Sequence, residues 1–296
     1  MSDEKIKYTR EEMADTLHVD PVLAERVWRA FGFPHDAEHQ QQFSADDVAA
    51  VAAFAGKNQH LDPTTQLAAA RAIGQSTARL AQWQADQIRT LAADPGTGLT
   101  TEQLVDALAH LQNLVWRRHL LSLLQADTSE AVDEEVVVGF ADIVGYTSMS
   151  RRLPMVELEA LLESFESGAH SIVSDHGGQI VKNIGDAVMF TVKSPAAAAS
   201  IALELHALTS DGELPSLCIG LAMGHTLARI GDVFGEPVNI AARLASAARS
   251  DTTLVDENVA KALEDDEDLR IHSIPTLSVR GYRRLKAYAL SARKRK

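Results

Sequence analysis

The chain has 296 residues, 46% of them apolar and 23% charged, a balance that excludes a disordered or fibrous protein. Its length exceeds the usual size of one domain, so we expect two. The excess of 41 Asp and Glu over 28 Lys and Arg gives a net charge of −13, which disfavours nucleic acid and anionic membranes as partners.

The sequence gives no indication of a membrane span. Its apolar runs are much shorter than the roughly 20 residues that cross a bilayer, and the first residues, MSDEKIKYTREEM, lack the apolar segment of a signal peptide. The single cysteine, Cys218, lies in the apolar run LCIGLAM and has no partner for an intrachain disulfide. We therefore expect a cytoplasmic protein with a buried thiol.

Residues 1–128 are predicted to form an all-helical domain. Apolar residues recur at helical spacing, for example over 67–91 and 101–124, and alternating patterns are nearly absent. Proline and glycine divide this half into short predicted helices at Gly32-Phe33-Pro34, Asp62-Pro63 and Asp94-Pro95-Gly96. A polar, acidic stretch then predicts a linker over residues 129–135.

Residues 136–296 alternate strand and helix patterns, which predicts an α+β domain. The strand candidates are 136–144, 180–184, 187–192, 217–228 and 277–290. The helix candidates are 153–173, 196–208, 238–248 and 258–263.

Two acidic residues interrupt apolar strand patterns in this second half. Asp142 stands inside FADIVGYT, where a lone buried carboxylate would be costly, and Asp186 follows Gly185 in KNIGDAVM, a hairpin signal. Each taken alone could be a structural or turn aspartate. Together they suggest two carboxylates at adjacent strand ends, a setting suited to Mg²⁺ or Mn²⁺.

A third motif, DVFGEPVNIAAR, begins with a glycine-containing turn at Asp232 and continues as a predicted helix. Asn239 and Arg243 are four residues apart, so they share one face of this helix and can converge on one ligand. An exposed polar pair at this spacing is usually only surface, and the signal gains weight from the other two motifs.

These three motifs, in this order, resemble the class III nucleotidyl cyclases over about residues 133–292. The resemblance implies a ferredoxin-like, palm-type catalytic domain and an adenylate cyclase that converts ATP to 3′,5′-cyclic AMP and pyrophosphate. It implies that Asp142 and Asp186 hold two metal ions, that Lys182 and Asp232 read the purine, and that Asn239 and Arg243 serve the ribose and the transition state.

Elementary chemistry agrees with these implied roles. Adenine offers an acceptor at N1 and a donor at N6, which match a Lys donor and an Asp acceptor, whereas guanine reverses both. A guanidinium such as that of Arg243 can stabilise the charge that develops on a phosphate under attack.

The segment VRGYRRLK near the C-terminus corresponds to a place where the family often has a lysine that contacts the terminal phosphates of the nucleotide. Its first basic residue is Arg280, which can clamp phosphate through two hydrogen bonds. In the family the site is shared across a two-fold interface, so one copy of each motif per chain implies a homodimer with two sites.

The first half allows more than one interpretation. Residues 8–48 resemble winged-helix regulators of the mercury-resistance type, yet the second predicted helix offers only Arg26 and Arg29 for phosphates, which argues against DNA binding. The layout also resembles the regulatory domain of actinobacterial pH-sensing adenylate cyclases. Six of the 11 histidines precede the linker, so regulation by pH is one hypothesis and scattered surface histidine is the other.

Two alternatives to an active cyclase remain at this point. One is a nucleotide-binding regulatory module without turnover, against which the intact set of acidic, amide and guanidinium groups argues. The other is a DNA-binding regulator with a nucleotide-sensing domain.

Overall fold

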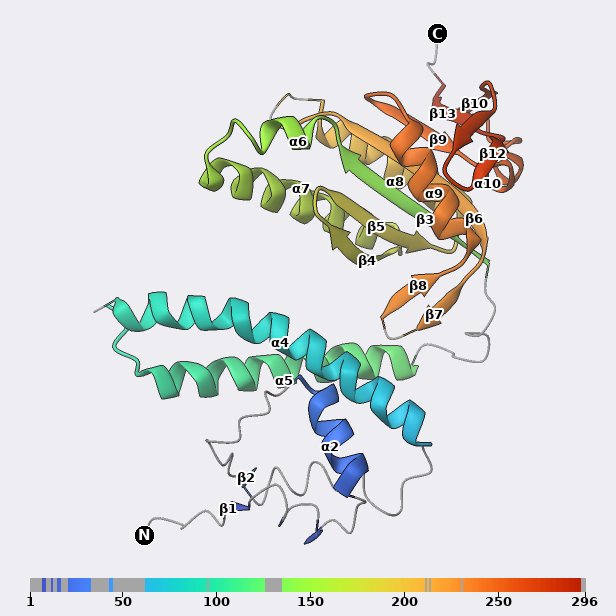
Figure 1. Ribbon diagram of the computed structural model, residues 1–296. Coiled ribbons are helices and arrows are strands. Elements are labelled where there is room, and N and C mark those ends of the chain that lie inside the picture. Colours follow the sequence, from blue (N-terminus) through green and yellow to red (C-terminus); the bar gives the residue numbers. More distant parts are fainter. Residues whose placement is uncertain are drawn as a thin grey trace. The chain divides into compact units, whose positions relative to one another are not determined.

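The computed structural model divides the chain into two compact units, residues 1–126 and 127–296, each with its own core (Figure 1). The residues that the structure describes are 7–8, 12, 15–16, 21–32, 43–44, 62–94, 96–125, 135–210, 212, 214–229 and 231–293.

The helices of the first unit for which the structure describes most of the length are α2 (Pro21–Ala30), α4 (Pro63–Ala93) and α5 (Thr101–Gln125). Helix α4 begins at an N-cap, because the Asp62 carboxylate accepts hydrogen bonds from the backbone N–H groups of Thr64 and Thr65 at 2.9 and 3.1 Å. A small core forms where Val27 of α2 packs against Leu67 and Ala70 of α4.

The helical prediction for this half is confirmed among the described residues, with two differences. Helix α4 runs unbroken for 31 residues and is not a short helix, because no proline follows its first residue and Gly74 is its single internal glycine. At Gly74 the backbone of Phe31 approaches the helix closely. The second difference is a two-residue antiparallel pairing of β1 (Lys7–Tyr8) with β2 (Phe43–Ser44). Most of the segment that resembles a winged helix lies outside the described residues. Within them, no helix is both long and apolar enough to cross a membrane.

The second unit is organised around a seven-stranded sheet in the order β10-β13-β9-β6-β3-β5-β4. All neighbouring strands are antiparallel except β6 and β9. The strands of this sheet are β3 (Glu135–Ile143), β4 (Gln179–Ile184), β5 (Ala187–Val192), β6 (Leu217–His225), β9 (Thr252–Val255), β10 (Leu269–Ser273) and β13 (Tyr288–Ala292). Two hairpins stand apart from it, β7 (Leu227–Arg229) with β8 (Asp232–Phe234) and β11 (Leu277–Val279) with β12 (Tyr282–Leu285).

Five helices accompany these strands: α6 (Tyr146–Met149), α7 (Met155–Asp175), α8 (Pro195–Leu208), α9 (Glu236–Ala247) and α10 (Glu257–Ala262). The succession β3-α7-β4-β5-α8-β6, with β3 between β6 and β5, is the ferredoxin-like arrangement, so the expected α+β fold is confirmed.

Alternation along β3 divides the core between the two faces of the sheet. Val137 and Ala141 belong to the larger cluster, to which α7 and α8 contribute, while Val138 and Phe140 pack with residues of α9. Asp142 continues the second series, so its side chain lies on the α9 face.

Several predicted boundaries were wrong. The expected strand 217–228 is two strands, β6 and β7, and the expected strand 277–290 is three, because Gly281 turns the chain with φ 90° between β11 and β12. The start of the third motif, expected as a turn, pairs as β8 with β7. Strands β9 and β10 were not predicted.

Candidate active site

The two acidic residues singled out from the sequence are brought together at one end of the sheet. Asp142 is near the end of β3, opposite Ala187 of β5, and Asp186 lies in the turn that joins β4 to β5. Gly185 begins that turn with φ 64°, and the N–H of Ile143 donates to the carbonyl of Asp186 at 3.2 Å. This hydrogen bond ties the turn to β3 next to the first carboxylate.

Burial and the neighbouring Asp186 raise the pKa of Asp142 to about 6. Burial has the larger effect, followed by the charge of Asp186 and a hydrogen-bonding contact between the two side chains. Two carboxylates in contact and partly shielded from water repel each other unless a proton or a cation lies between them.

This donor set fits a divalent cation. Carboxylate oxygens are the ligands that Mg²⁺ and Mn²⁺ prefer, and the mutual repulsion of Asp142 and Asp186 is what a cation would relieve. The described residues contain no cluster of three or more His, Cys, Asp or Glu side chains placed to hold a metal, so the other oxygen ligands would have to come from substrate or water.

Lys182 of β4 and Asp232 of β8 form an ion pair although they are 50 positions apart in the sequence. The Lys182 Nζ donates to both carboxylate oxygens, at 2.7 and 2.6 Å. The hydrogen bond from Lys182 is the main reason that the pKa of Asp232 is lowered. The hairpin of β7 and β8 therefore places the Asp232 carboxylate beside the Lys182 ammonium of β4, in reach of solvent.

Asn239 and Arg243 lie on α9, as their spacing predicts. The helix begins after Gly235, whose φ of 146° is a conformation that side chains rarely adopt, and the Asn239 Nδ2 donates to the Gly235 carbonyl at 3.4 Å. Gly220 of β6 has no side chain to separate it from the backbone of Ala241 and Ala245, so α9 lies directly on the sheet.

Tyr282 of β12 connects the second hairpin with the start of α9. Its hydroxyl lies 3.5 Å from the Glu236 Oε1, and burial together with the charge of Glu236 raises the pKa of Tyr282, while Arg243 lowers it. Tyr282 is thus a neighbour of Arg243 that the sequence motifs did not single out.

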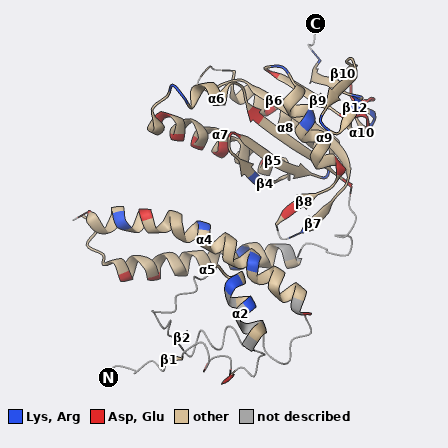
Figure 2. Cartoon of the chain, in the orientation of Figure 1, with Lys and Arg blue, Asp and Glu red and all other residues tan. Residues whose placement is uncertain are grey.

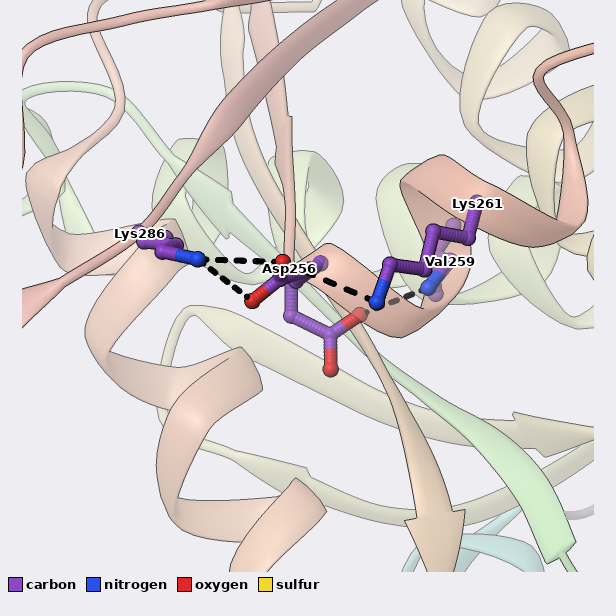
Figure 3. A network of polar contacts seen from close by, with 5 residues as sticks. Asp256, Val259, Lys261 and Lys286 are labelled. Atoms are coloured by element: carbon purple, nitrogen blue, oxygen red, sulfur yellow. Dashed lines mark hydrogen bonds and ion pairs between the residues drawn. The ribbon is translucent and has the colours of Figure 1, made fainter.

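The basic residues of VRGYRRLK have different environments. Lys286 donates to both carboxylate oxygens of Glu257 at 3.1 and 3.2 Å, within the polar network around Asp256 and Lys261 (Figure 3). Arg280 is exposed in the turn between β11 and β12. Of these two residues, Lys286 is committed to a carboxylate of its own chain.

Cys218 differs from the sequence expectation. It is half-buried, not buried, and its thiol donates to the Ala248 carbonyl at 3.3 Å just beyond α9. The register of β3 with β6 sets Cys218 directly opposite Asp142, and burial together with the charges of Asp142 and Asp251 raises the pKa of the thiol. Only the strand pairing could have revealed this neighbour of the carboxylates.

The six side chains from the three motifs are grouped in pairs. Asp142 contacts Asp186, Lys182 contacts Asp232, and α9 carries the other two on one face. Among the described residues, the hydrogen bonds and ion pairs of these side chains do not join one pair to another.

Comparison with known proteins gives consistent results. Residues 129–292 match the family described as the adenylate and guanylate cyclase catalytic domain. An adenylate cyclase of Streptomyces coelicolor is 38% identical over 274 residues, which cover 87% of this chain and 72% of the relative. A pH-sensitive adenylate cyclase of Mycobacterium tuberculosis is 27% identical over 289 residues, or 90% of this chain and 72% of the relative.

Among solved structures, the catalytic core of a rhodopsin-guanylyl cyclase with converted specificity, in complex with ATPαS, superimposes with a TM-score of 0.50. The two proteins are 24% identical, and the match covers 55% of this chain and 98% of that structure. This likeness supports the fold of the second unit.

Proposed function

The chain belongs to the adenylate and guanylate cyclase catalytic-domain family, and on that basis we propose that it is an adenylate cyclase that converts ATP to 3′,5′-cyclic AMP and pyrophosphate. Since the family includes enzymes for both purines, the observation that carries this proposal is the ion pair of Lys182 with Asp232. It offers a donor for adenine N1 and an acceptor for the N6 amino group, whereas guanine presents the opposite pattern.

Asp142 and Asp186 would hold two divalent cations, Mg²⁺ or Mn²⁺, in each site. When bound, such ions acidify the ribose 3′-hydroxyl and neutralise charge on the triphosphate. The two carboxylates sit at the rigid end of β3 and in a turn fixed by the Ile143 N–H, so their position is set before substrate arrives.

Asn239 and Arg243 would act on the reacting end of the nucleotide. The Asn239 amide orients the ribose, and the Arg243 guanidinium donates to the α-phosphate oxygens as the 3′-hydroxyl attacks and pyrophosphate departs. Arg280, exposed in its turn, would contact the terminal phosphates. The close packing of α9 on Gly220 holds Asn239 and Arg243 in place, so that the helix need not move when the nucleotide binds.

We further propose that the enzyme is a homodimer whose sites are completed across a two-fold axis. The separation of the six side chains into pairs within one chain supports this assembly, since a partner would bring its own pairs to the same interface. Residues 1–128 would regulate turnover, in response to pH among other signals, a role supported by the resemblance to a pH-sensitive relative.

Subunit mixing tests the shared site. Asp142→Ala chains and Arg243→Ala chains should each be inactive as homodimers. The control is Asp175→Ala, which removes an exposed carboxylate and should leave activity unchanged. After exchange, half of the dimers are mixed and each has one intact site of two, so about a quarter of wild-type cyclic AMP formation should return.

The result depends on where the two lesions fall. If each site were built within one chain, mixing could not restore activity, because every site would still contain one of the two substitutions. If mass analysis confirms exchange and the mixture stays as inactive as its parents, the shared site is wrong. If the wild-type chain with ATP and Mn²⁺ forms no cyclic AMP, the proposed activity itself is wrong.

A further inference from the structure

Tyr282 is the first residue of β12 and lies beside the start of α9. It pairs with Val279 across the turn that carries Arg280, and its ring packs against the buried cluster to which Leu244 of α9 belongs. Its hydroxyl reaches the Glu236 Oε1 at 3.5 Å. Packing therefore holds the ring, while the hydroxyl reaches the first turn of the helix.

Glu236 and Arg243 lie on the same side of α9. The difference in their positions is seven residues, about 20° short of two full turns, which corresponds to a rise of about 10.5 Å along the helix axis. Side chains of a helix incline towards its N-terminus, so an extended Arg243 side chain can reach back towards the Glu236 carboxylate. In the part of the chain that the structure describes, no ion pair joins these two residues.

The Tyr282 hydroxyl is close to both of these charged groups. Burial raises the pKa of Tyr282 most, the charge of Glu236 raises it further, and the nearby charge of Arg243 lowers it. A phenol has one proton to donate, and here the Glu236 carboxylate accepts it. The carboxylate is therefore engaged by a neutral donor at the place where the guanidinium of the same helix could otherwise bind it.

The hairpin that carries Tyr282 is otherwise basic. Arg280 lies in its turn, and Arg283 and Arg284 follow on β12; all three are exposed and are blue in the charge view of Figure 2. Their charges attract phosphate and carboxylate groups alike. A phenol at position 282 adds a hydrogen-bond donor without a further charge, so it can hold Glu236 and leave the positive charge of the turn for the nucleotide.

We propose that Tyr282 is a positioning residue for Arg243. Its hydroxyl engages the Glu236 carboxylate and thereby prevents an ion pair between Glu236 and Arg243 along α9. The inference rests on the proposed function, in which the guanidinium must be free to donate to the α-phosphate oxygens. An ion pair on α9 would have to be broken before the guanidinium could act, so its absence favours turnover.

Tyr282→Phe in the full-length chain removes the hydroxyl and keeps the ring. The released Glu236 carboxylate should then bind Arg243, so kcat for cyclic AMP formation is expected to fall by about tenfold while KM for ATP stays within about twofold. The matched control is Tyr288→Phe, which removes a hydroxyl from a half-buried ring on β13 and should leave both constants unchanged. Circular dichroism and thermal unfolding check that each variant is folded.

Two double variants show whether the hydroxyl acts through Glu236 and Arg243. Glu236→Gln removes the negative charge that would bind the guanidinium, so Tyr282→Phe with Glu236→Gln should keep at least about half of the kcat of Glu236→Gln alone. In an Arg243→Ala background, Tyr282→Phe should lower kcat no further, because the side chain that it positions is absent. A hydroxyl that served only the stability of the fold would lower kcat in both backgrounds.

The outcomes separate this inference from the proposed function. If the wild-type chain forms cyclic AMP and Tyr282→Phe has the same kcat, the positioning role is wrong and the cyclase stands. A rise in KM at constant kcat, or a loss of kcat that Glu236→Gln does not relieve, also overturns the positioning role. If the wild-type chain forms no cyclic AMP, the proposed function is wrong and the role of Tyr282 in turnover is wrong with it.

Discussion

Lys182 and Asp232 are joined through two short contacts, yet both side chains remain accessible, at 41% and 30% exposure. Ion pairs this open to solvent contribute little to stability, because water screens the charges and the side chains lose entropy on pairing. The pair therefore contributes little to the stability of the fold, and its proposed role is to bind the purine.

Reversing this pattern should change the choice of purine. In Lys182→Glu with Asp232→Cys, the group facing N1 becomes an acceptor, so we expect kcat/KM for ATP to fall by at least about tenfold and the GTP to ATP ratio to rise. Steady-state kinetics with both nucleotides measure the change. Arg270→Glu with Asp175→Cys makes the same charge changes at exposed sites and should not alter selectivity. Unchanged ATP kinetics in the first variant would refute the purine-reading roles.

Arg243 should matter chiefly in the transition state. Arg243→Ala is expected to lower kcat by about 10² to 10³ with little change in KM, because charge on the α-phosphate oxygens grows as the 3′-hydroxyl attacks. The control is Arg249→Ala, at an exposed guanidinium shortly after α9. A rise in KM at constant kcat would instead assign Arg243 to ground-state binding.

His206 should make the second unit less stable in acid. Its Nε2 lies 2.9 Å from the Thr253 hydroxyl, its Nδ1 is buried without a partner, and burial lowers the pKa of the imidazole although Asp251 acts in the opposite direction. The unfolded chain then binds the proton more tightly than the folded chain does. The contribution of neutral His206 to the free energy of unfolding is therefore present above pH 6.5 and is lost as the pH falls through that value.

Thermal unfolding at several pH values measures this effect. The difference in Tm between the wild-type protein and His206→Gln should narrow or reverse as the solution is acidified, whereas His272→Gln, at an exposed histidine, should follow the wild-type curve. Asp256, whose pKa burial raises to about 6, acts with the opposite sign but is present in all three proteins. A constant difference in Tm across this range would contradict the role of His206.

Removing the first unit should change how activity depends on pH. A chain that begins at Asp133 is expected to differ from the full-length chain in its activity or its pH–rate curve, because a domain attached to a dimeric catalytic unit can bias it between productive and unproductive arrangements. Parallel assays of cyclic AMP formation from pH 5.5 to 8 make the comparison. Superimposable curves would leave residues 1–128 without this regulatory role.

Strong local patterns predicted some elements closely. The run AVMFTV is β5 with the expected bounds, and the apolar period over 101–124 became α5. In contrast, TTLV forms β9 with only four residues, three of them buried, so no alternation distinguished it from a loop. The apolar residues of 277–290 predicted one strand, and the turns that divide it depend on Gly281 and on tertiary packing.

The same contrast holds in the candidate site. Spacing alone predicted that Asn239 and Arg243 share a helix face, and turn chemistry placed Asp186 in a hairpin beside a strand end. The contact between Lys182 and Asp232 spans 50 positions, and the approach of Cys218 to Asp142 depends on strand register. Relationships of this kind arise from the order of strands in the sheet, which local periodicity does not encode.

The absence of a side chain at Gly220 implies that a substitution there would abolish turnover while the chain still binds nucleotide. A methyl group there would meet the backbone of Ala241 and Ala245 and push α9, with Asn239 and Arg243, away from the sheet, whereas Lys182 lies on β4, which is not a neighbour of β6 in the sheet. A single added carbon could thus convert a cyclase into a nucleotide receptor. Turnover by this chain is therefore expected to depend on the small volume beneath α9, even when every polar group of the site is retained.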